Sequence, residues 1–533
     1  MSRAAAMEIA TIPAQFESTL AQTPDKEAIF GGGASLTFRQ LHSEAVAAAR
    51  GLSELGVRPG DRVGIWMQKT LDQVVSILGV LFANAIVVPI HPLLRAQQVG
   101  HVAGDCEMKI LVTEAPRAAE IRDIVAAKII LGRGLDEEGL TSLVRLRWEC
   151  QGGECFFDRQ PNDTAAIIYS SGSTGRPKGI VIAQRNFADG ARIVAGYLGT
   201  QSTDRIAGVL ALTFDYGLNQ LWQTLYRGSS LYLHDLIFPR DLFRLLANER
   251  ITALPVMPFI VSRMFDPQLP GHEDNLDFSA LRYICNTGGT VTLRMLDQLR
   301  ATFPHSNVVL MYGLTEAFRS SWLPPDQVPV RPDSIGKAIP EVELYVLDEL
   351  GRDCPPGVPG QLVHRGSCVT KGYWKAPEAT AERFRQIDRF PGETVVFSGD
   401  LVKRDEEGYL YFLGRMDSMI KAYGFRVSPT EIEDHMRRFD GVLDAVAFGI
   451  DNPEIGQDIA VAYTTLDGTP CTANRLVEHF RLDLPHHMVP RWFIHMESFP
   501  ATANQGKVDR VLVRQLSLEK LTALSSMEAH HSA

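Results

Sequence analysis

Segments with the periodicity of β-strands and α-helices alternate through the first part of the chain. Thr37 and Gln40 form a capping-box pattern, and the apolar residues that follow are spaced three and four apart, which predicts an amphipathic helix. Alternation of strands and helices is typical of layered α/β sheets, so we predict an α/β fold. The further elements predicted here are strands at 63–66, 86–90 and 109–113, with helices from about 71 and around 99.

The length of 533 residues exceeds what one hydrophobic core usually organises, so we expect at least two domains. From about residue 336 short strands with Gly and Pro turns predict a small antiparallel, β-barrel-like unit that closes the large domain. A second capping box at 428–431, with strand-like runs at 442–450 and 460–464, predicts a small α+β domain. We place the large N-terminal domain at 1–414 and the C-terminal domain at 415–533, with a frayed polar tail after Leu516.

Composition and charge exclude several classes of function. The net charge is −10, from 53 basic and 63 acidic residues without a basic block, which argues against a nucleic-acid partner. Seven scattered cysteines favour neither a disulfide framework nor a zinc site. The N-terminus lacks the apolar core of a secretory signal, and the apolar stretch 74–90 divides into a buried helix and strand. We therefore expect a cytoplasmic protein without a membrane span.

The segment 169–179, YSSGSTGRPKG, is the strongest local signal. Glycines that turn tightly, hydroxyl donors and a lysine suit a polyphosphate, and the apolar flanks predict a strand on each side. The Walker pattern is not met, because Pro177 precedes the lysine and Gly179 follows it. A flexible Ser/Gly linker is the alternative. The predicted phosphate-binding residues are Ser170, Ser171, Gly172, Ser173, Thr174, Gly175 and Lys178.

This loop resembles the signature loop of the adenylate-forming superfamily, which includes acyl-CoA synthetases, peptide-synthetase adenylation domains and beetle luciferases. Four more motifs follow in the order of that family: YGLTE at 312–316, SGD at 398–400, GRMD at 414–417 running into Lys421, and GK at 506–507. The resemblance covers about residues 16–513. It implies a mobile C-terminal domain that acts as a lid.

By this resemblance Lys507 spans the substrate carboxylate and the phosphate, and Asp417 is the hinge on which the small domain rotates. The rotation exchanges Lys507 for Lys421 and Gly424 and admits a thiol. From the residues alone, Lys507 has the alternative of a solvated surface lysine, and Asp417 that of a turn residue.

Nucleotide binding is expected from residues that follow predicted strands. Glu316 suits Mg²⁺, and its alternative is a glutamate at a helix N-terminus. By resemblance Thr315 binds phosphate and Tyr312 lies against adenine. Asp400 and Arg415 would bind the ribose, or form a surface ion pair. The segment Gly288, Gly289 and Thr290 would let the backbone approach the purine.

The predicted acid pocket contains two charged residues. Asp215 resembles the aspartate with which amino-acid-adenylating domains hold an ammonium group, and Arg319 matches a specificity position that suits a second carboxylate. The alternative is that Asp215 and Arg319 pair with each other and select nothing charged. The other pocket residues are Phe214, at the aromatic gate position of the family, Asn219 and Met311.

The resemblance implies an AMP-forming ligase that uses ATP and Mg²⁺ to activate a small polar acid, with amino acids among the candidates. The acyl adenylate would then react with the phosphopantetheine thiol of CoA or of a separate carrier protein. The alternatives are a CoA ligase for a simple carboxylic acid, a non-catalytic adenylate-binding relative and a luciferase-like oxidase. The wording FDYGLNQ and YGLTEAFRS also resembles exosortase-associated acyl-CoA ligases.

Overall fold

The computed structural model divides the chain into two units. The N-terminal unit holds residues 1–344 and 363–397, and the C-terminal unit holds residues 345–362 and 398–533. The predicted domain boundary after residue 414 stays a prediction. The structure describes residues 10–134, 136, 140–149, 159–171, 177–236, 238–266, 269, 276–289, 291–416, 418–422, 425–452, 456–502 and 507–531.

A six-stranded sheet in the N-terminal unit has the order β6-β5-β3-β4-β7-β8. Its neighbours are parallel except for β7 and β8, which form an antiparallel pair. The short runs of Val, Ile and Leu in the parallel strands are mostly buried, as expected of strands covered on both faces. The strands are β3 Arg62–Trp66, β4 Ile86–Pro89, β5 Ile110–Thr113, β6 Lys128–Leu131, β7 Thr164–Ser171 and β8 Pro177–Ala183.

A second sheet of this unit includes the order β14-β13-β12-β11-β9-β10-β1-β2. Strands β13, β12, β11, β9, β10 and β1 run parallel, whereas β2 and β14 are antiparallel to their neighbours, and β15 is antiparallel to β14. The strands are β1 Glu27–Gly31, β2 Ala34–Thr37, β9 Arg205–Gly208, β10 Ser230–Leu233, β11 Ala253–Val256, β12 Tyr283–Asn286, β13 Asn307–Leu314, β14 Phe318–Leu323 and β15 Ser334–Ala338.

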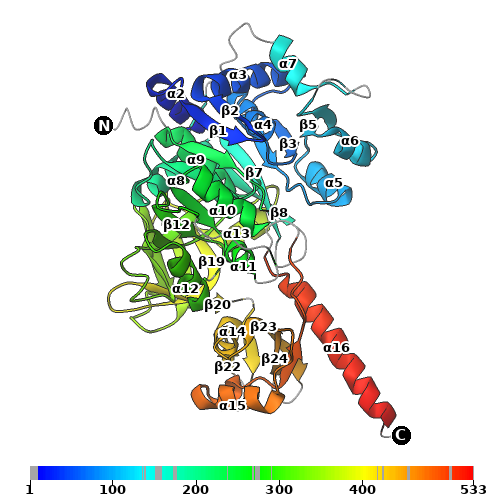
Figure 1. Cartoon of the computed structure of the whole chain (residues 1–533), viewed down its shortest axis with the longest axis vertical. Coiled ribbons are helices and arrows are strands. Elements are labelled where there is room, and N and C mark those ends of the chain that lie inside the picture. The colour runs from blue at the N-terminus through cyan, green and yellow to red at the C-terminus, as the bar shows by residue number, and fades with distance from the viewer. Residues whose placement is uncertain are drawn as a thin grey trace. The chain divides into compact units, whose positions relative to one another are not determined.

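Helices join the strands of both sheets (Figure 1), so the α/β fold is confirmed. The predicted capping box is present at the start of α3, where Thr37 Oγ1 accepts from the Gln40 amide and Gln40 Oε1 accepts from the Thr37 amide. Helices α2, α8 and α9 pack on one another, and α4 packs on α2 and α3. The helices are α2 Ile12–Gln22, α3 Phe38–Glu54, α4 Leu71–Phe82, α5 Ala96–Asp105, α6 Ala115–Ile121, α7 Leu143–Glu149, α8 Gln184–Tyr197, α9 Asp215–Arg227, α10 Pro239–Asn248, α11 Pro258–Met264, α12 Leu293–Thr302 and α13 Pro377–Arg383.

Short strands follow residue 336 as predicted, and the chain passes from one unit to the other within three of them. Pairing runs in the order β16-β17-β19-β20, and β19 is antiparallel to both β18 and β20. These strands are β16 Val342–Leu347, β17 Gly360–Gly366, β18 Phe384–Arg385, β19 Val395–Arg404 and β20 Leu410–Arg415.

The rest of the C-terminal unit is an α+β structure with the sheet order β22-β21-β24-β23 and with β25 parallel to β24. Apolar clusters around Phe480 and around Val513 form its core. The predicted frayed tail is wrong, because α16 continues to residue 531. The elements are β21 Ile420–Ala422, β22 Phe425–Val427, α14 Pro429–Arg437, β23 Val442–Asn452, β24 Gly456–Thr465, α15 Ala473–Asp483, a 3₁₀ turn His486–Met488, β25 Trp492–His495 and α16 Arg510–His531.

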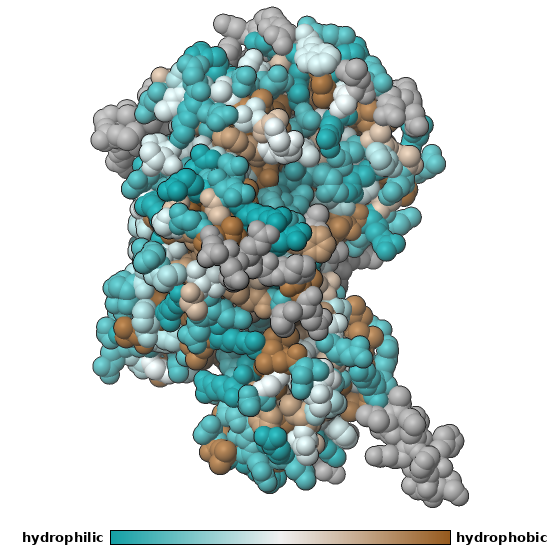
Figure 2. Space-filling view, viewed as in Figure 1, coloured by the Kyte–Doolittle hydropathy of each residue, from teal (hydrophilic) through white to brown (hydrophobic). Residues whose placement is uncertain are grey.

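The surface is mainly hydrophilic on the face shown in Figure 2, where brown apolar side chains are scattered among teal ones. Among the described helices, none has both the length and the hydropathy that crossing a bilayer requires. The apolar stretch 74–90 is instead divided between α4 and β4, as the sequence predicts, and lies in the core.

Candidate active site

The predicted phosphate-binding segment begins and ends in the hairpin of β7 and β8. Ser170 lies opposite Lys178, and the last pair of the hairpin joins Ser171 to Pro177. The apolar flanks therefore form strands as predicted. The tip of the hairpin, with Gly172, Ser173, Thr174 and Gly175, lies outside the described residues, as does the side chain of Ser171.

The segment 371–374 runs beside β8 and brings Tyr373 close to Lys178. The amide of Lys371 donates to the Val181 carbonyl at 2.9 Å, and the amide of Trp374 donates to the Gly179 carbonyl at 2.7 Å. The amine of Lys178 lies 5.5 Å from the centre of the Tyr373 ring, within the range of a cation–π contact.

Tyr373 also contacts Glu316, the predicted magnesium ligand. Its hydroxyl donates to Oε1 of Glu316 at 2.7 Å. The Glu316 carbonyl accepts from the amide and the hydroxyl of Thr370 at 2.9 and 3.0 Å, so both backbone and side chain are held. Glu316 lies in the turn between β13 and β14, which rules out the alternative of a helix N-terminus.

The turn that carries Thr315 and Glu316 depends on a glycine. A Cβ at Gly313 would lie 2.2 Å from the Phe318 carbonyl oxygen, closer than any real contact. Gly313 therefore lets β13 and β14 approach closely just before the turn. This gives a physical reason for the glycine of the YGLTE motif.

On the far side of the turn, Asp215 and Arg319 form a buried ion pair. Asp215 lies in the first turn of α9, and Nη1 of Arg319 on β14 donates to its Oδ2 at 2.7 Å. The side chains are 11% and 1% exposed. Thr315 Oγ1 lies 3.5 Å from Oδ1 of Asp215. The alternative of mutual pairing is therefore what the structure contains.

Aromatic and polar side chains surround this pair. The Arg319 guanidinium lies 4.6 Å from the centre of the Tyr216 ring. Burial opposes its charge, but attraction to Asp215 outweighs burial and raises the pKa of Arg319. The Tyr197 hydroxyl lies 2.9 Å from Sδ of Met311. Of the remaining predicted pocket residues, Phe214 is the N-cap of α9 and Asn219 lies one turn after Asp215, fully buried.

The predicted adenine contacts lie at the ends of parallel strands of the second sheet. Tyr312 is on β13, and its ring stacks on the buried His364 ring with 6.2 Å between their centres. Burial lowers the pKa of His364 to about 3, so the imidazole is neutral near pH 7. Gly288 follows β12 with a φ of +82°, which favours glycine. Gly289 is adjacent, and Thr290 lies outside the described residues.

In the C-terminal unit the structure pairs Asp400 with Arg415. They lie opposite each other on β19 and β20, and Nη1 of Arg415 donates to Oδ1 of Asp400 at 2.9 Å. Asp400 is 5% exposed, so the pair is not a plain surface ion pair. Lys421 lies on β21, and nothing is described of its side chain. Asp417 and Gly424 lie outside the described residues.

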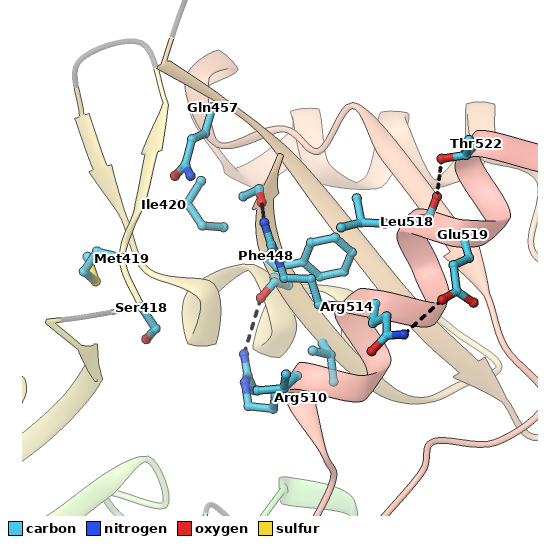
Figure 3. Close-up of a pocket in the computed structure, with 15 residues that line it drawn as sticks. Ser418, Met419, Ile420, Phe448, Gln457, Arg510, Arg514, Leu518, Glu519 and Thr522 are labelled. Atoms are coloured by element: carbon cyan, nitrogen blue, oxygen red, sulfur yellow. Dashed lines mark hydrogen bonds between the residues drawn. The ribbon is translucent and has the colours of Figure 1, made fainter. Parts of the chain in front are cut away.

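Lys507 precedes α16 in a segment held by backbone bonds. The Lys507 carbonyl accepts from the Thr502 amide at 2.6 Å, and Ala501 pairs with Val508. Arg510, three residues later, donates to the buried carboxylate of Glu433. It also borders a pocket of about 1000 Å³ between α16 and the strands β23 and β24 (Figure 3).

Sequence reasoning missed Tyr373 and His364. Tyr373 lies 57 residues after Glu316 in the sequence and contacts it only through the tertiary fold. A tyrosine that contacts a distant carboxylate gives no periodic signal in the sequence. The only local signal in the sequence around Tyr373 is the motif GYW at 372–374, shortly before the Pro-Glu pair that begins α13.

Comparison with known proteins agrees with this geometry. The profile of the AMP-binding enzymes matches residues 16–374, and that of the C-terminal domain of AMP-binding enzymes matches residues 431–506. The first match covers more than half of the chain. The chain belongs to the AMP-binding enzyme family. It is thus an AMP-forming ligase, either an acyl-CoA synthetase or an amino-acid adenylation enzyme.

Three relatives illustrate the range of this AMP-binding family. Gramicidin S synthase 2 of Brevibacillus brevis is 30% identical over 511 residues, which are 94% of this chain and 11% of that protein, so the chain spans a small part of the relative. The ATP-bound structure of MatB from Rhodopseudomonas palustris is 26% identical, covers 95% of this chain and 98% of its own, and has a TM-score of 0.86. O-succinylbenzoate coenzyme A synthetase from Bacillus subtilis, in complex with ATP and a magnesium ion, is 22% identical, covers 94% and 99%, and has a TM-score of 0.81, which shows the shared fold.

Proposed function

We propose that the chain activates a carboxylic acid with ATP and transfers the acyl group to a thiol. The observation that carries this proposal is a continuous line of contacts in the N-terminal unit. It runs from Lys178 through Tyr373 to Glu316, whose neighbour Thr315 contacts Asp215. Groups suited to a polyphosphate thereby adjoin the buried ion pair of Asp215 and Arg319.

In the first step a carboxylate oxygen attacks the α-phosphorus of ATP, forming an acyl adenylate as the bond to pyrophosphate breaks. Lys178 and the hairpin tip would bind phosphate oxygens, and Lys507 would stabilise the charge that develops at the reacting phosphorus. In the second step a thiol sulfur attacks the acyl carbon, AMP leaves and the thiol proton is released. Rotation about Asp417 would bring Lys421 and Gly424 to the site for this step.

Glu316 is suited to a magnesium ion shared with ATP. Mg²⁺ is commonly held by one or two carboxylates together with substrate phosphates and water. Among the described residues there is no cluster of three or more potential metal ligands. Bound Mg²⁺ would neutralise charge on the phosphates, while Tyr373 and Thr370 keep Glu316 in place.

Two acid classes are in question, and one variant separates them. An amino acid would place its ammonium group near Asp215, whereas a simple acid would leave Asp215 with Arg319 alone. The Asp215→Ala variant should abolish activation in the first case and retain the choice of acid in the second. Use of CoA or a carrier protein as acceptor, and a link to exosortase-associated ligases, are further parts of this proposal.

Acid-dependent exchange of pyrophosphate into ATP tests the proposal directly. A panel of fatty, aryl, α-amino, β-amino and dicarboxylic acids should include at least one that drives exchange. Exchange with one acid class, lost in Lys507→Ala, would support the ligase. Absence of exchange with every acid, together with unimpaired ATP binding, would favour a non-catalytic relative. Light emission with a luciferin would instead support the oxidase.

A further inference from the structure

The Asp215–Arg319 pair leaves one edge of the guanidinium without a partner. Only Nη1 of Arg319 donates to Asp215, whereas Nε and Nη2 are buried and have no hydrogen-bond partner among the described residues. More than nine-tenths of buried polar groups in proteins are satisfied. An unsatisfied buried donor is costly, so two on one side chain point to a ligand that supplies the missing acceptors.

The two unpartnered atoms define the shape of that group. Nε and Nη2 lie on the same edge of the planar guanidinium and point in nearly parallel directions. Such an edge can form two parallel hydrogen bonds to one carboxylate. A single acceptor atom would leave one of the two donors unpaired. Its position is fixed, because Arg319 is held by Asp215 on one side and stacks on Tyr216.

A third unpartnered donor lies on the same helix as Asp215. Asn219 is fully buried, and its Oδ1 already accepts from Gln223 Nε2 at 2.8 Å. Its Nδ2 has no partner among the described residues. Residues four apart share one face of a helix, so Asn219 projects from the face of α9 that carries Asp215. The unpartnered polar atoms of Arg319 and Asn219 are therefore all hydrogen-bond donors.

Donors in excess select against an ammonium group. The carboxylate of Asp215 is engaged by Arg319, so an ammonium would have to compete with the guanidinium for it while facing a like charge. A carboxylate meets the free edge of Arg319, and the N-terminus of α9 favours negative charge nearby. We infer that the acid activated by this enzyme carries a second carboxylate, bound at the Nε–Nη2 edge of Arg319. This inference rests on the proposed ligase function.

Matched acids test the inference in the wild-type chain. Pyrophosphate exchange is measured with straight acids of equal length that end in methyl, carboxylate or ammonium, for example valerate, glutarate and 4-aminobutyrate, over lengths of three to seven carbons. At the preferred length the dicarboxylate should exceed both counterparts in kcat/KM by at least about tenfold, the lower limit for a good charged contact. Preference for the methyl or ammonium acid would overturn the inference while retaining the ligase.

The variant Arg319→Lys examines the same edge. Lysine keeps a positive charge for Asp215 but lacks the planar fork, so kcat/KM for the dicarboxylate should fall about 10- to 100-fold relative to kcat/KM for the methyl acid. Arg192→Lys is the matched control, because Arg192 forms a two-bond pair with Glu341 at the surface. An equal loss for both acids in Arg319→Lys would mean a purely structural pair and overturn the inference. Failure of every acid to drive exchange would instead reject the ligase function on which it rests.

Discussion

The hydroxyl of Tyr373 lies 2.7 Å from Oε1 of Glu316, and the ring of the same tyrosine lies 5.5 Å from the amine of Lys178. One side chain thus joins the predicted metal ligand to the predicted phosphate-binding lysine. The hydrogen bond fixes the direction of the Glu316 carboxylate, and the ring supports the charge of Lys178. Tyr373 would therefore position both groups if they bind metal and phosphate as predicted.

The variant Tyr373→Phe should lower adenylation by about 10- to 100-fold, the usual effect of losing a group that orients a metal ligand. The ring under Lys178 is kept, so the loss should appear mainly as a higher Mg²⁺ concentration for half-maximal exchange. Tyr411→Phe is the control, since Tyr411 also donates to a carboxylate, that of Asp405 at 3.0 Å. An unchanged Mg²⁺ dependence in Tyr373→Phe would remove Tyr373 from the site.

The Asp215–Arg319 pair should also matter for stability. Asp215→Ala leaves a guanidinium buried without its counter-charge, and breaking a buried pair from one side costs about 3–5 kcal/mol. The double variant Asp215→Ala with Arg319→Met removes both charges and should recover part of that loss. Urea unfolding of the wild type, both single variants and the double variant gives the coupling free energy. Strict additivity of the two single effects would contradict a direct pair.

Buried His364 should make the free energy of unfolding sensitive to acid. Its pKa is about 3 in the folded chain, below the ordinary value near 6.5, because burial disfavours the imidazolium. As the pH falls below 6.5 the unfolded chain binds the proton first, so stability declines from there down to about pH 3, by roughly 1.4 kcal/mol per pH unit at full slope.

The variant His364→Leu should remove this contribution. Between pH 7 and pH 5 the wild type should lose about 2 kcal/mol more than the variant, as measured by urea unfolding at each pH. His91, whose pKa burial lowers to about 4, is present in both proteins and cancels in the comparison. Parallel pH profiles for the two proteins would mean that His364 is hydrated or protonated in the folded chain.

Much of the fold follows from local signals in the sequence. The capping box at Thr37, the division of 74–90 and the strands that flank the hairpin are each set by neighbouring residues. The prediction of a frayed tail is wrong because helix propensity outweighs polarity in this segment. The stretch from 518 to 531 is rich in Leu, Glu, Lys, Ala and Met, which favour helix even when exposed.

The site was less predictable wherever contacts join distant segments. Asp215 and Arg319 are 104 residues apart, and the sequence allows either mutual pairing or a charged ligand for each. Only the arrangement of α9 against β14 decides that they pair, and only then is the free edge of Arg319 apparent. The same holds for Tyr373 and Glu316, since a hydrogen bond between loops depends on the packing of whole elements.

The contact between Arg510 and Glu433 ties the start of α16 to α14. Glu433 is 3% exposed, and Arg510 Nη1 donates to its Oε2 at 3.0 Å, while its Oε1 accepts from the Ala447 amide at 2.8 Å. Glu433→Leu should lower the stability of the C-terminal unit by about 3 kcal/mol, because Arg437 and the Ala447 amide also lose a partner. Hydrogen exchange at the Ala447 amide measures this.

A smaller effect is expected from the other partner. Arg510→Met leaves Glu433 with Arg437, 3.7 Å away, so the stability loss should be about 1 kcal/mol. Arg510 follows Lys507 by only three residues. We therefore expect the rate of adenylation to fall by a larger factor than this loss of stability alone would cause. Arg514→Met is the control, because Arg514 lies one turn later on α16 and lines the same pocket (Figure 3). Equal effects of the two arginine variants on adenylation would contradict a specific role for Arg510.

The two steps of the proposed reaction should depend on different lysines. Lys507→Ala should lower pyrophosphate exchange by about 100-fold or more, the usual loss when a group that stabilises developing charge is removed. Thioester formation from a supplied acyl adenylate should change little, because the thiol attacks the acyl carbon and no bond to phosphorus changes in this step. Lys520→Ala, at an exposed lysine on α16, is the control for the alternative that Lys507 is a solvated surface residue. If exchange in Lys507→Ala matched that control, adenylation would not depend on Lys507.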